Sequence, residues 1–363
     1  MTIAFDDFIR RIIRTIEDIG FFDRTFLAEK LGMSREQLDV FLREYFFAKS
    51  FAIRAYPNYA RLGLRYTIVL LDFSFKWIDK ARDFLDAMAR EGFLVTWIKP
   101  FGGYTYLTHH TIPSGSLKDY KKFFDHLTDL GLLTGYRFYE LDSEPEGFAY
   151  DPVVFDYRKG EWKERAEATR VERTLKEVPK EPFLGLDEMD LLILDRLQRS
   201  SLQSVDAMAS SLNSPLEDVK FHLQNHVIGE NLVKKYLLDI FNTEMLSPQT
   251  AVLIGLCEGI RGEQRDELYE YLLSHPYLGY INSDARTVEF ALEMPWRVVP
   301  IFSTLLDKKV EEAKPAQYFF GTSVLGQIHT FTVPYEHYKG GKWSFNEEEV
   351  FNTYQRYLEN QTL

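Results

Sequence analysis

Histidines are the residues whose type and spacing in this chain could support chemistry. His222 and His226 are four residues apart in a predicted helix, so both imidazoles fall on one face and could hold a metal ion. The sequence places no third ligand beside them, so we predict no metal site there and interpret the pair as surface or DNA-facing histidines. His109 and His110 are adjacent on a predicted strand, and their side chains should therefore point to opposite faces.

Other catalytic signatures do not stand out in the sequence. We find no glycine-rich nucleotide-binding motif, no Ser-His-Asp signature and no pair of catalytic carboxylates. From this we predict that the chain is not an enzyme and uses no cofactor.

Composition limits the class of protein further. The chain has 363 residues, 45% of them hydrophobic, which is enough for two or three domains with apolar cores. The single cysteine, Cys257, excludes an internal disulfide framework and a cysteine-based zinc site. No long apolar run and no signal-peptide pattern is found, so we expect a cytoplasmic protein without membrane contact. The net charge of −12 argues against nonspecific nucleic-acid binding over the whole surface.

The two halves of the chain repeat one pattern at a constant offset of 181 residues. At this offset FDDFIRRIIRTIE, from Phe5, aligns with LDEMDLLILDRLQ, from Leu186. The same offset aligns YRKGEW at Tyr157–Trp162 with YKGGKW at Tyr338–Trp343. The chain is therefore predicted to contain two diverged copies of one unit.

Each unit is predicted to begin with a winged helix-turn-helix. In the first copy an amphipathic helix is followed by a short helix near Phe26–Leu31, a turn at Gly32, and a third helix capped by Ser34 with Gln37. The second copy has Asn213 at the turn, and we expect Ser214 to cap a helix that starts with Pro215. The wings are predicted at 51–62, as two strands with a turn at Pro57-Asn58, and at 232–240.

The remainder of each unit is predicted to be a βαββαβ domain. In the first copy apolar strand-length runs alternate with two amphipathic helices, and Gly102-Gly103 marks a hairpin turn. This element order is the ferredoxin-like motif. A Y-x-x-G-x-W stretch and a charged helix close each unit, the first helix being predicted at 164–178.

The predicted fold class is therefore α+β, with two tandem units that form a pseudo-dimer. Six segments are expected: winged helix-turn-helix 1 (1–64), ferredoxin-like domain 1 (65–150), a closing element with a linker helix (151–185), winged helix-turn-helix 2 (186–245), ferredoxin-like domain 2 (246–330), and a C-terminal closing element and helix (331–363).

This order of elements resembles the Lrp/AsnC (feast-or-famine) family of transcription regulators. The stretch Leu186–Gln198 is similar to that family's opening helix, L-D-x-x-D-x-x-I-L-x-x-L-Q. The resemblance implies a covalent pseudo-dimer that binds double-stranded DNA through its helix-turn-helix units and regulates transcription. It also implies a small-molecule effector between the α/β domains, for which Gly102, Gly103 and Tyr104 are the candidates. The closing Y-x-x-G-x-W element lies outside that family's pattern and indicates a distinct, archaeal tandem branch.

A helix-turn-helix reads the major groove with the start of its third helix, while neighbouring cations contact phosphates. The first helix-turn-helix has 10 Lys and Arg against 9 Asp and Glu, and the second has 5 against 10, so the first is expected to be the better DNA reader. The candidate DNA contacts are Arg35, Gln37, Arg43, Lys49, Arg54 and Arg61 in the first copy and Lys220, Gln224, Asn225, Lys234 and Lys235 in the second.

Two alternatives stay open at this point. Because the chain is acidic, the helix-turn-helix units could bind proteins of the transcription machinery instead of DNA. The chain also resembles siroheme decarboxylases, which share this architecture as fused pairs and use histidines around a tetrapyrrole, but we find no T-H-N-Y-type motif here. The pseudo-dimer could also pair again into a homodimer through the C-terminal helix at 347–358.

Overall fold

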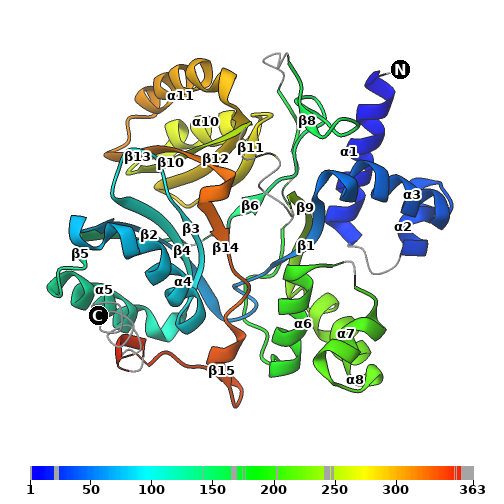
Figure 1. The fold of residues 1–363 in the computed structure, drawn as a ribbon, viewed down its shortest axis with the longest axis horizontal. Helices are drawn as coiled ribbons and strands as arrows, with labels where there is room; N and C mark the ends of the chain where they lie inside the picture. Colours follow the sequence, from blue (N-terminus) through cyan, green and yellow to red (C-terminus); the bar gives the residue numbers. More distant parts are fainter. Residues whose placement is uncertain are drawn as a thin grey trace.

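The computed structural model describes residues 2–19, 24–141, 143–164, 170–173, 175, 177–201, 203–240, 246, 249–346, 348 and 350–352. Two α/β domains lie on one side of the molecule and two helical domains on the other, with a two-stranded ribbon between them (Figure 1). This is the tandem α+β pseudo-dimer predicted from the repeat. Among the described residues, no helix is both long enough and apolar enough to cross a membrane.

The first helix-turn-helix forms as the sequence predicts. Gly32 has φ +70° at the turn, a conformation that glycine adopts without strain. Ser34 accepts a hydrogen bond from the Gln37 backbone at 3.2 Å, and the Gln37 side chain accepts one from the Ser34 backbone at 2.9 Å. This reciprocal pair is the predicted capping box. The three helices are α1 (Thr2–Ile19), α2 (Arg24–Leu31) and α3 (Arg35–Tyr45).

The second helix-turn-helix differs in its last helix. Asn213 has φ +51°, as expected for the residue that replaces glycine at the turn. The predicted cap by Ser214 is wrong, because its hydroxyl donates to the Leu212 carbonyl at 3.2 Å and Pro215 precedes the helix. The helices are α6 (Glu188–Arg199), α7 (Val205–Leu212) and α8 (Leu216–Phe221), and a π-helical turn, η4, continues α8 over His222–Ile228.

The predicted wings do not form as separate hairpins. The wing strand of the first copy, β1 (Phe51–Pro57), pairs antiparallel with the wing strand of the second, β9 (Val233–Ile240), with Ile53 opposite Leu238. Most of the β1 side chains are buried, because the ribbon lies at the centre of the molecule (Figure 1). The predicted two-strand wing at 51–62 is therefore wrong, since each unit supplies one strand to a shared ribbon; the strand predicted at 232–240 forms as β9.

Each α/β domain has the ferredoxin-like strand order expected from βαββαβ. The first sheet runs β3-β4-β2-β5 and the second β13-β10-β12-β11. The elements of the first domain are β2 (Leu64–Phe73), α4 (Ala81–Glu91), β3 (Leu94–Ile98), β4 (Thr105–Pro113), α5 (Leu117–Asp129) and β5 (Leu133–Glu140). Those of the second are β10 (Thr250–Glu258), α10 (Gly262–Leu273), β11 (Leu278–Ser283), β12 (Thr287–Pro295), α11 (Val299–Ala313) and β13 (Gln317–Val324).

The units exchange their next strands reciprocally. The strand after the first domain, β6 (Glu146–Gly147), pairs with β11 of the second sheet. The strand after the second domain, β14 (Ile328–Thr330), pairs with β3 of the first sheet. Both exchanged strands cross the middle of the molecule in Figure 1. Each sheet therefore has five strands only because the other unit completes it.

The closing elements also join the units. They are small hairpins, β7 (Phe155–Asp156) with β8 (Glu161–Trp162), and β15 (Tyr338–Lys339) with β16 (Lys342–Trp343). The Trp162 indole donates to the Thr250 hydroxyl at 2.7 Å, and the Trp343 indole donates to the Leu62 carbonyl at 2.6 Å. Each repeated tryptophan thus binds the opposite unit.

The linker and C-terminal helices were predicted less well. Of the helix expected at 164–178, residues 165–169, 174 and 176 lie outside the described residues, and 170–173 are not helical. There the backbone N–H of Val171 donates to the Ser274 carbonyl at 3.0 Å instead of to a carbonyl one helical turn earlier in the chain. Of the helix expected at 347–358, the described residues 348 and 350–352 are helical and the others lie outside the described residues.

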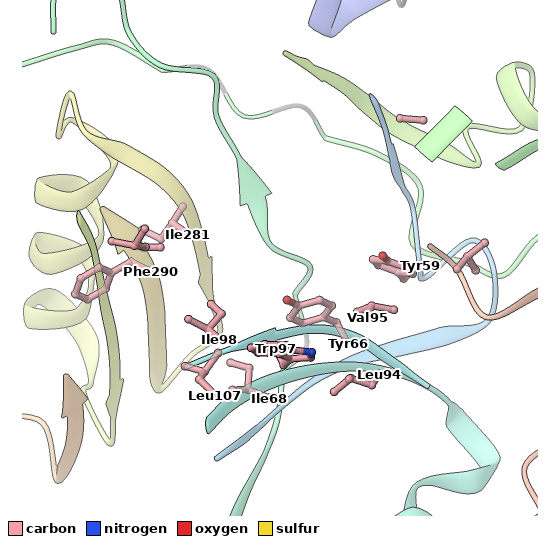
Figure 2. Packing of buried hydrophobic residues seen from close by; sticks show 14 of the residues in the cluster. Tyr59, Tyr66, Ile68, Leu94, Val95, Trp97, Ile98, Leu107, Ile281 and Phe290 are labelled. Carbon is pink, nitrogen blue, oxygen red and sulfur yellow. The ribbon is translucent and has the colours of Figure 1, made fainter. Parts of the chain in front are cut away.

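The hydrophobic core is continuous through both units. Figure 2 shows Tyr66, Ile68, Trp97 and Leu107 packed in the first sheet, with Ile281 and Phe290 in the second sheet nearby. The core holds the two α/β domains in fixed relation, which is what positions the residues of the central cavity.

Candidate active site between the two units

A cavity of about 1090 Å³ lies between the ribbon, the two sheets and the exchanged strands. It is lined by residues of both copies, including Arg54 and Tyr56 of β1, His109 of β4 and Tyr280 of β11. Ligand pockets for small molecules and cofactors have volumes of roughly 300–1,000 Å³, so this cavity suits a large ligand.

A hydrogen-bonded triad of side chains joins the two units at the wall of the cavity. The His109 Nε2 atom is 2.6 Å from Oε1 of Glu289, which is fully buried on β12. The Tyr280 hydroxyl donates to the same Oε1 at 2.8 Å and lies 3.5 Å from His109 Nε2. The Tyr66 ring packs tilted against the imidazole, with ring centroids 5.3 Å apart. The second carboxylate oxygen of Glu289 is buried and has no hydrogen-bond partner among the described residues.

The tyrosines of this wall stay protonated. Burial and the nearby Glu289 carboxylate raise the pKa of Tyr280 and of Tyr66 well above the ordinary value. Burial raises the pKa of Tyr56 in the same direction. These hydroxyls are therefore hydrogen-bond donors near neutral pH.

Arginines surround the cavity. Arg54, with 28% of its side chain exposed, lies 3.5 Å from Asp239 through Nη1, and its buried Nε has no hydrogen-bond partner among the described residues. Three further arginines that line the cavity, Arg82, Arg90 and Arg199, are exposed. Guanidinium groups bind carboxylates in a planar, two-bonded geometry. The arrangement therefore suits a ligand with several carboxylates.

A second acidic residue of β12 lines the cavity itself. Glu293 of β12 accepts a hydrogen bond from the Tyr150 hydroxyl at 2.6 Å. Burial raises the pKa of Glu293 to about 7, with Asp239 contributing to the same effect. Glu293 can therefore carry a proton near neutral pH.

The predicted DNA contacts fall into two groups. Arg35, Gln37 and Arg43 are exposed on α3, and Lys49 is half-buried with its stem beside Gly160. In the second copy, Gln224 and Asn225 are exposed on η4, and Lys220 is half-buried and paired with Glu217 at 3.0 Å.

The other predicted contacts are wrong, because their cationic groups are committed inside the protein. Arg61 is buried and binds the Glu230 carboxylate at 2.6 Å and the Glu181 carbonyl at 2.7 Å. Lys234 and Lys235 are buried, with their ammonium groups 2.5 and 3.3 Å from the Glu146 carboxylate.

Arg54 was also assigned to DNA, and it lines the central cavity instead. The predictions for Arg54, Arg61, Lys234 and Lys235 all placed these residues on a wing. The shared ribbon replaces both wings, so the cations lie inside the protein or along its cavity.

The predicted effector residues also lie elsewhere. Gly102, Gly103 and Tyr104 form an exposed turn between β3 and β4, and none of them lines the central cavity. A cavity between the units is present, but it is built from the ribbon and sheet faces. In the sequence, the weak signal for this cavity was His109. Its strand neighbour His110 is buried and hydrogen-bonded to Tyr120 at 2.8 Å.

No family model matches the chain, and no curated protein sequence matches it. Among solved structures, the chain is similar to the siroheme decarboxylase NirDL, with 10% identity, a TM-score of 0.58, and coverage of 96% of this chain and 99% of that chain. It is also similar to NirDL in co-complex with an iron-uroporphyrin III analogue, with 11% identity, a TM-score of 0.56, and coverage of 98% and 100%. A transcriptional regulatory protein of the AsnC family from Pyrococcus furiosus matches over 38% of this chain and 88% of its own length, with 17% identity and a TM-score of 0.27.

The full-length similarity establishes the fold, two helix-turn-helix units and two ferredoxin-like domains in one chain. It also corrects our prediction that the chain is not an enzyme. That prediction rested on the absence of catalytic motifs in the sequence, whereas both full-length matches are to an enzyme.

Proposed function

We propose that this chain is an enzyme that removes CO2 from a carboxylate side chain of a tetrapyrrole bound in the central cavity. The observation that carries the proposal is the cavity itself, which combines the His109–Glu289–Tyr280 triad with four arginines in one space of about 1090 Å³. The full-length similarity to a siroheme decarboxylase supports this choice of substrate class.

The lining suits the two chemical parts of such a substrate. A tetrapyrrole has a wide apolar ring, and Tyr56, Tyr66, Val95 and Ile98 provide aromatic and aliphatic contact surface. Its carboxylates need cationic donors, which the arginines provide. Arg54 lines the cavity with 28% of its side chain exposed, so its guanidinium group can meet a carboxylate of the ligand.

The triad supplies the proton that the reaction requires. When the C–CO2 bond breaks, its electron pair stays on the substrate carbon, and a proton must form the new C–H bond. His109 can donate this proton and regain one from water through the cavity. Glu289, which lies 2.6 Å away, stabilises the protonated imidazole before the transfer.

Binding and turnover can be measured separately. We expect the purified chain to bind iron-uroporphyrin III in a spectroscopic titration and to release CO2 from siroheme, detected as the loss of carboxyl mass from the product. A His109→Gln variant should bind the porphyrin and lose turnover, whereas Lys118→Gln, on the exposed face of α5, should behave like the parent. Absence of porphyrin binding by the folded parent chain would refute the proposal.

DNA binding by the first helix-turn-helix is the second candidate function. It is favoured by one observation, the exposure of Arg35, Gln37 and Arg43 on the capped helix α3. Selection from random duplex DNA at low salt should enrich a motif that an Arg35→Ala/Arg43→Ala variant no longer selects. If no duplex is retained, a protein partner of the transcription machinery becomes the better explanation for this exposed face.

A further inference from the structure

A second cluster of chemically active side chains lies outside the cavity, in the second helix-turn-helix. We propose that Asp187, Asp190, His222 and His226 bind one divalent transition-metal ion of the Zn²⁺ type. One ligand atom from each side chain can be chosen so that all four lie within 4.8 Å of one another.

Two helices supply the ligands in pairs. Asp187 caps α6 and Asp190 is three residues further on, so both carboxylates stand at the first turn of that helix. His222 and His226 follow on η4, and their imidazole rings are 4.8 Å apart. Isolated π-helical turns inside helices are rare and occur often at functional sites. This turn begins at one of the histidines and includes the other.

The distances between ligand atoms match those of a tetrahedral site. With metal–ligand bonds of about 2.0–2.1 Å, the ligand atoms of a tetrahedral Zn²⁺ site lie about 3.3 Å from one another. Here the Nδ1 atoms of His222 and His226 are 2.9 and 3.1 Å from Oδ1 of Asp190. His222 Nδ1 is 3.5 Å from Oδ2 of Asp187. Both imidazoles therefore turn the same nitrogen toward one point between the helices.

The chemistry of the donor set also suits such an ion. Imidazole nitrogens with carboxylate oxygens bind Zn²⁺ and its neighbours in the first transition row, and four protein ligands are typical of a structural site. Asp190 is fully buried, and its carboxylate would be costly to bury without a strong positive partner. Phe183 and Phe221 lie beside His226, with ring centroids 5.2 and 5.3 Å away, and shield one side of the cluster.

The first copy shows that the fold does not need this cluster. At the offset of 181 residues, Asp190, His222 and His226 correspond to Ile9, Phe41 and Tyr45. There the same helix crossing is filled by hydrophobic contacts, with the rings of Phe41 and Tyr45 4.7 Å apart. The polar set is therefore specific to the second copy, and a variant that carries the first copy's residues should still fold.

The test uses the full-length protein after dialysis against a chelator. Calorimetric titration with ZnCl2 alone should show one ion per chain and a dissociation constant below micromolar, and bound Zn²⁺ should raise the melting temperature. Bound Co²⁺ should give the intense visible spectrum of a tetrahedral site. These readouts do not depend on the proposed activity, so they can fail or succeed independently of it.

Three variants make the assignment specific. Asp190→Ile/His222→Phe/His226→Tyr reproduces the first copy's packing and should fold without binding Zn²⁺. His226→Gln keeps three ligands and should weaken binding by about tenfold or more. His126→Gln, on α5 and outside the cluster, should bind as the parent does. A parent chain that binds no Zn²⁺, or a triple variant that binds it equally well, would overturn the proposal.

Discussion

The Nε2 atom of His109 lies 2.6 Å from Oε1 of Glu289, and these two residues belong to different copies of the repeat. In the register of the two sheets, β4 aligns with β12 so that His109 corresponds to Ala291 and Glu289 to Leu107. The pair therefore occurs once, although the scaffold around it is present twice. One reaction centre at a pseudo-symmetric interface fits a single ligand that contacts both units.

Neutralising the carboxylate of this pair should affect turnover more than binding. We expect Glu289→Gln to reduce the decarboxylation rate by roughly 10²- to 10⁴-fold, the usual contribution of a positioned acid or base. The porphyrin dissociation constant should change little, because Glu289 is buried behind His109. Single-turnover kinetics and a spectroscopic titration measure the two quantities, and an equal loss of both would contradict a catalytic role.

Removing the half-buried Arg54 from the cavity should instead weaken ligand binding more than turnover. Arg54→Gln should weaken binding of a carboxylate-bearing porphyrin by about 10- to 100-fold, the equivalent of roughly 1.5–3 kcal/mol for a hydrogen bond to a charged group. Arg286→Gln, on the exposed turn before β12, is the matched control and should bind normally. Equal affinities for the two variants would exclude Arg54 from the binding site.

The buried ion cluster under the ribbon should contribute strongly to stability. Glu146→Gln leaves the ammonium groups of Lys234 and Lys235 buried without their carboxylate partner. Removing one partner of a buried pair costs about 3–5 kcal/mol of unfolding free energy. Urea denaturation measures this change, and Glu312→Gln, which breaks an exposed pair on α11, should change it far less.

Glu293 should make the protein less stable as the pH rises. Its pKa in the folded protein is about 7, above the ordinary value of 4.5, so the folded state holds the proton more tightly than the unfolded state. The stabilisation is therefore complete below about pH 4.5 and is lost as the pH rises through 7. Comparing melting temperatures of the parent and Glu293→Gln from pH 5 to 8 should show a smaller decline in the variant. Parallel curves would contradict this assignment.

Local pattern was enough to predict the repeat, the helices of the helix-turn-helix and α/β domains, and the order of the βαββαβ strands, but not the linker at 164–178, where residues 170–173 are not helical. It failed for the ribbon, because β1 finds its partner β9 in the other copy, and no local signal reports such pairing. Lys234 and Lys235 look like surface cations in sequence for the same reason, since their partner Glu146 comes from a strand that is itself exchanged.

The central cavity and the histidine cluster show the same limit. Arg54, His109 and Tyr280 are far apart in the chain and meet only when the two units pack. Asp190 could be recognised as a helix-capping residue, but its position beside His222 and His226 depends on how α6 crosses η4.

The exchange of β6 and β14 has a consequence for assembly. In two separate subunits, such an exchange would depend on protein concentration, because each sheet would wait for a strand from another molecule. The covalent link replaces that encounter with a high effective concentration of the partner strand. This chain can therefore complete both sheets, and the cavity between them, at any dilution. Each half can also differ in sequence from the other, because it pairs with the other half of its own chain and not with an identical copy.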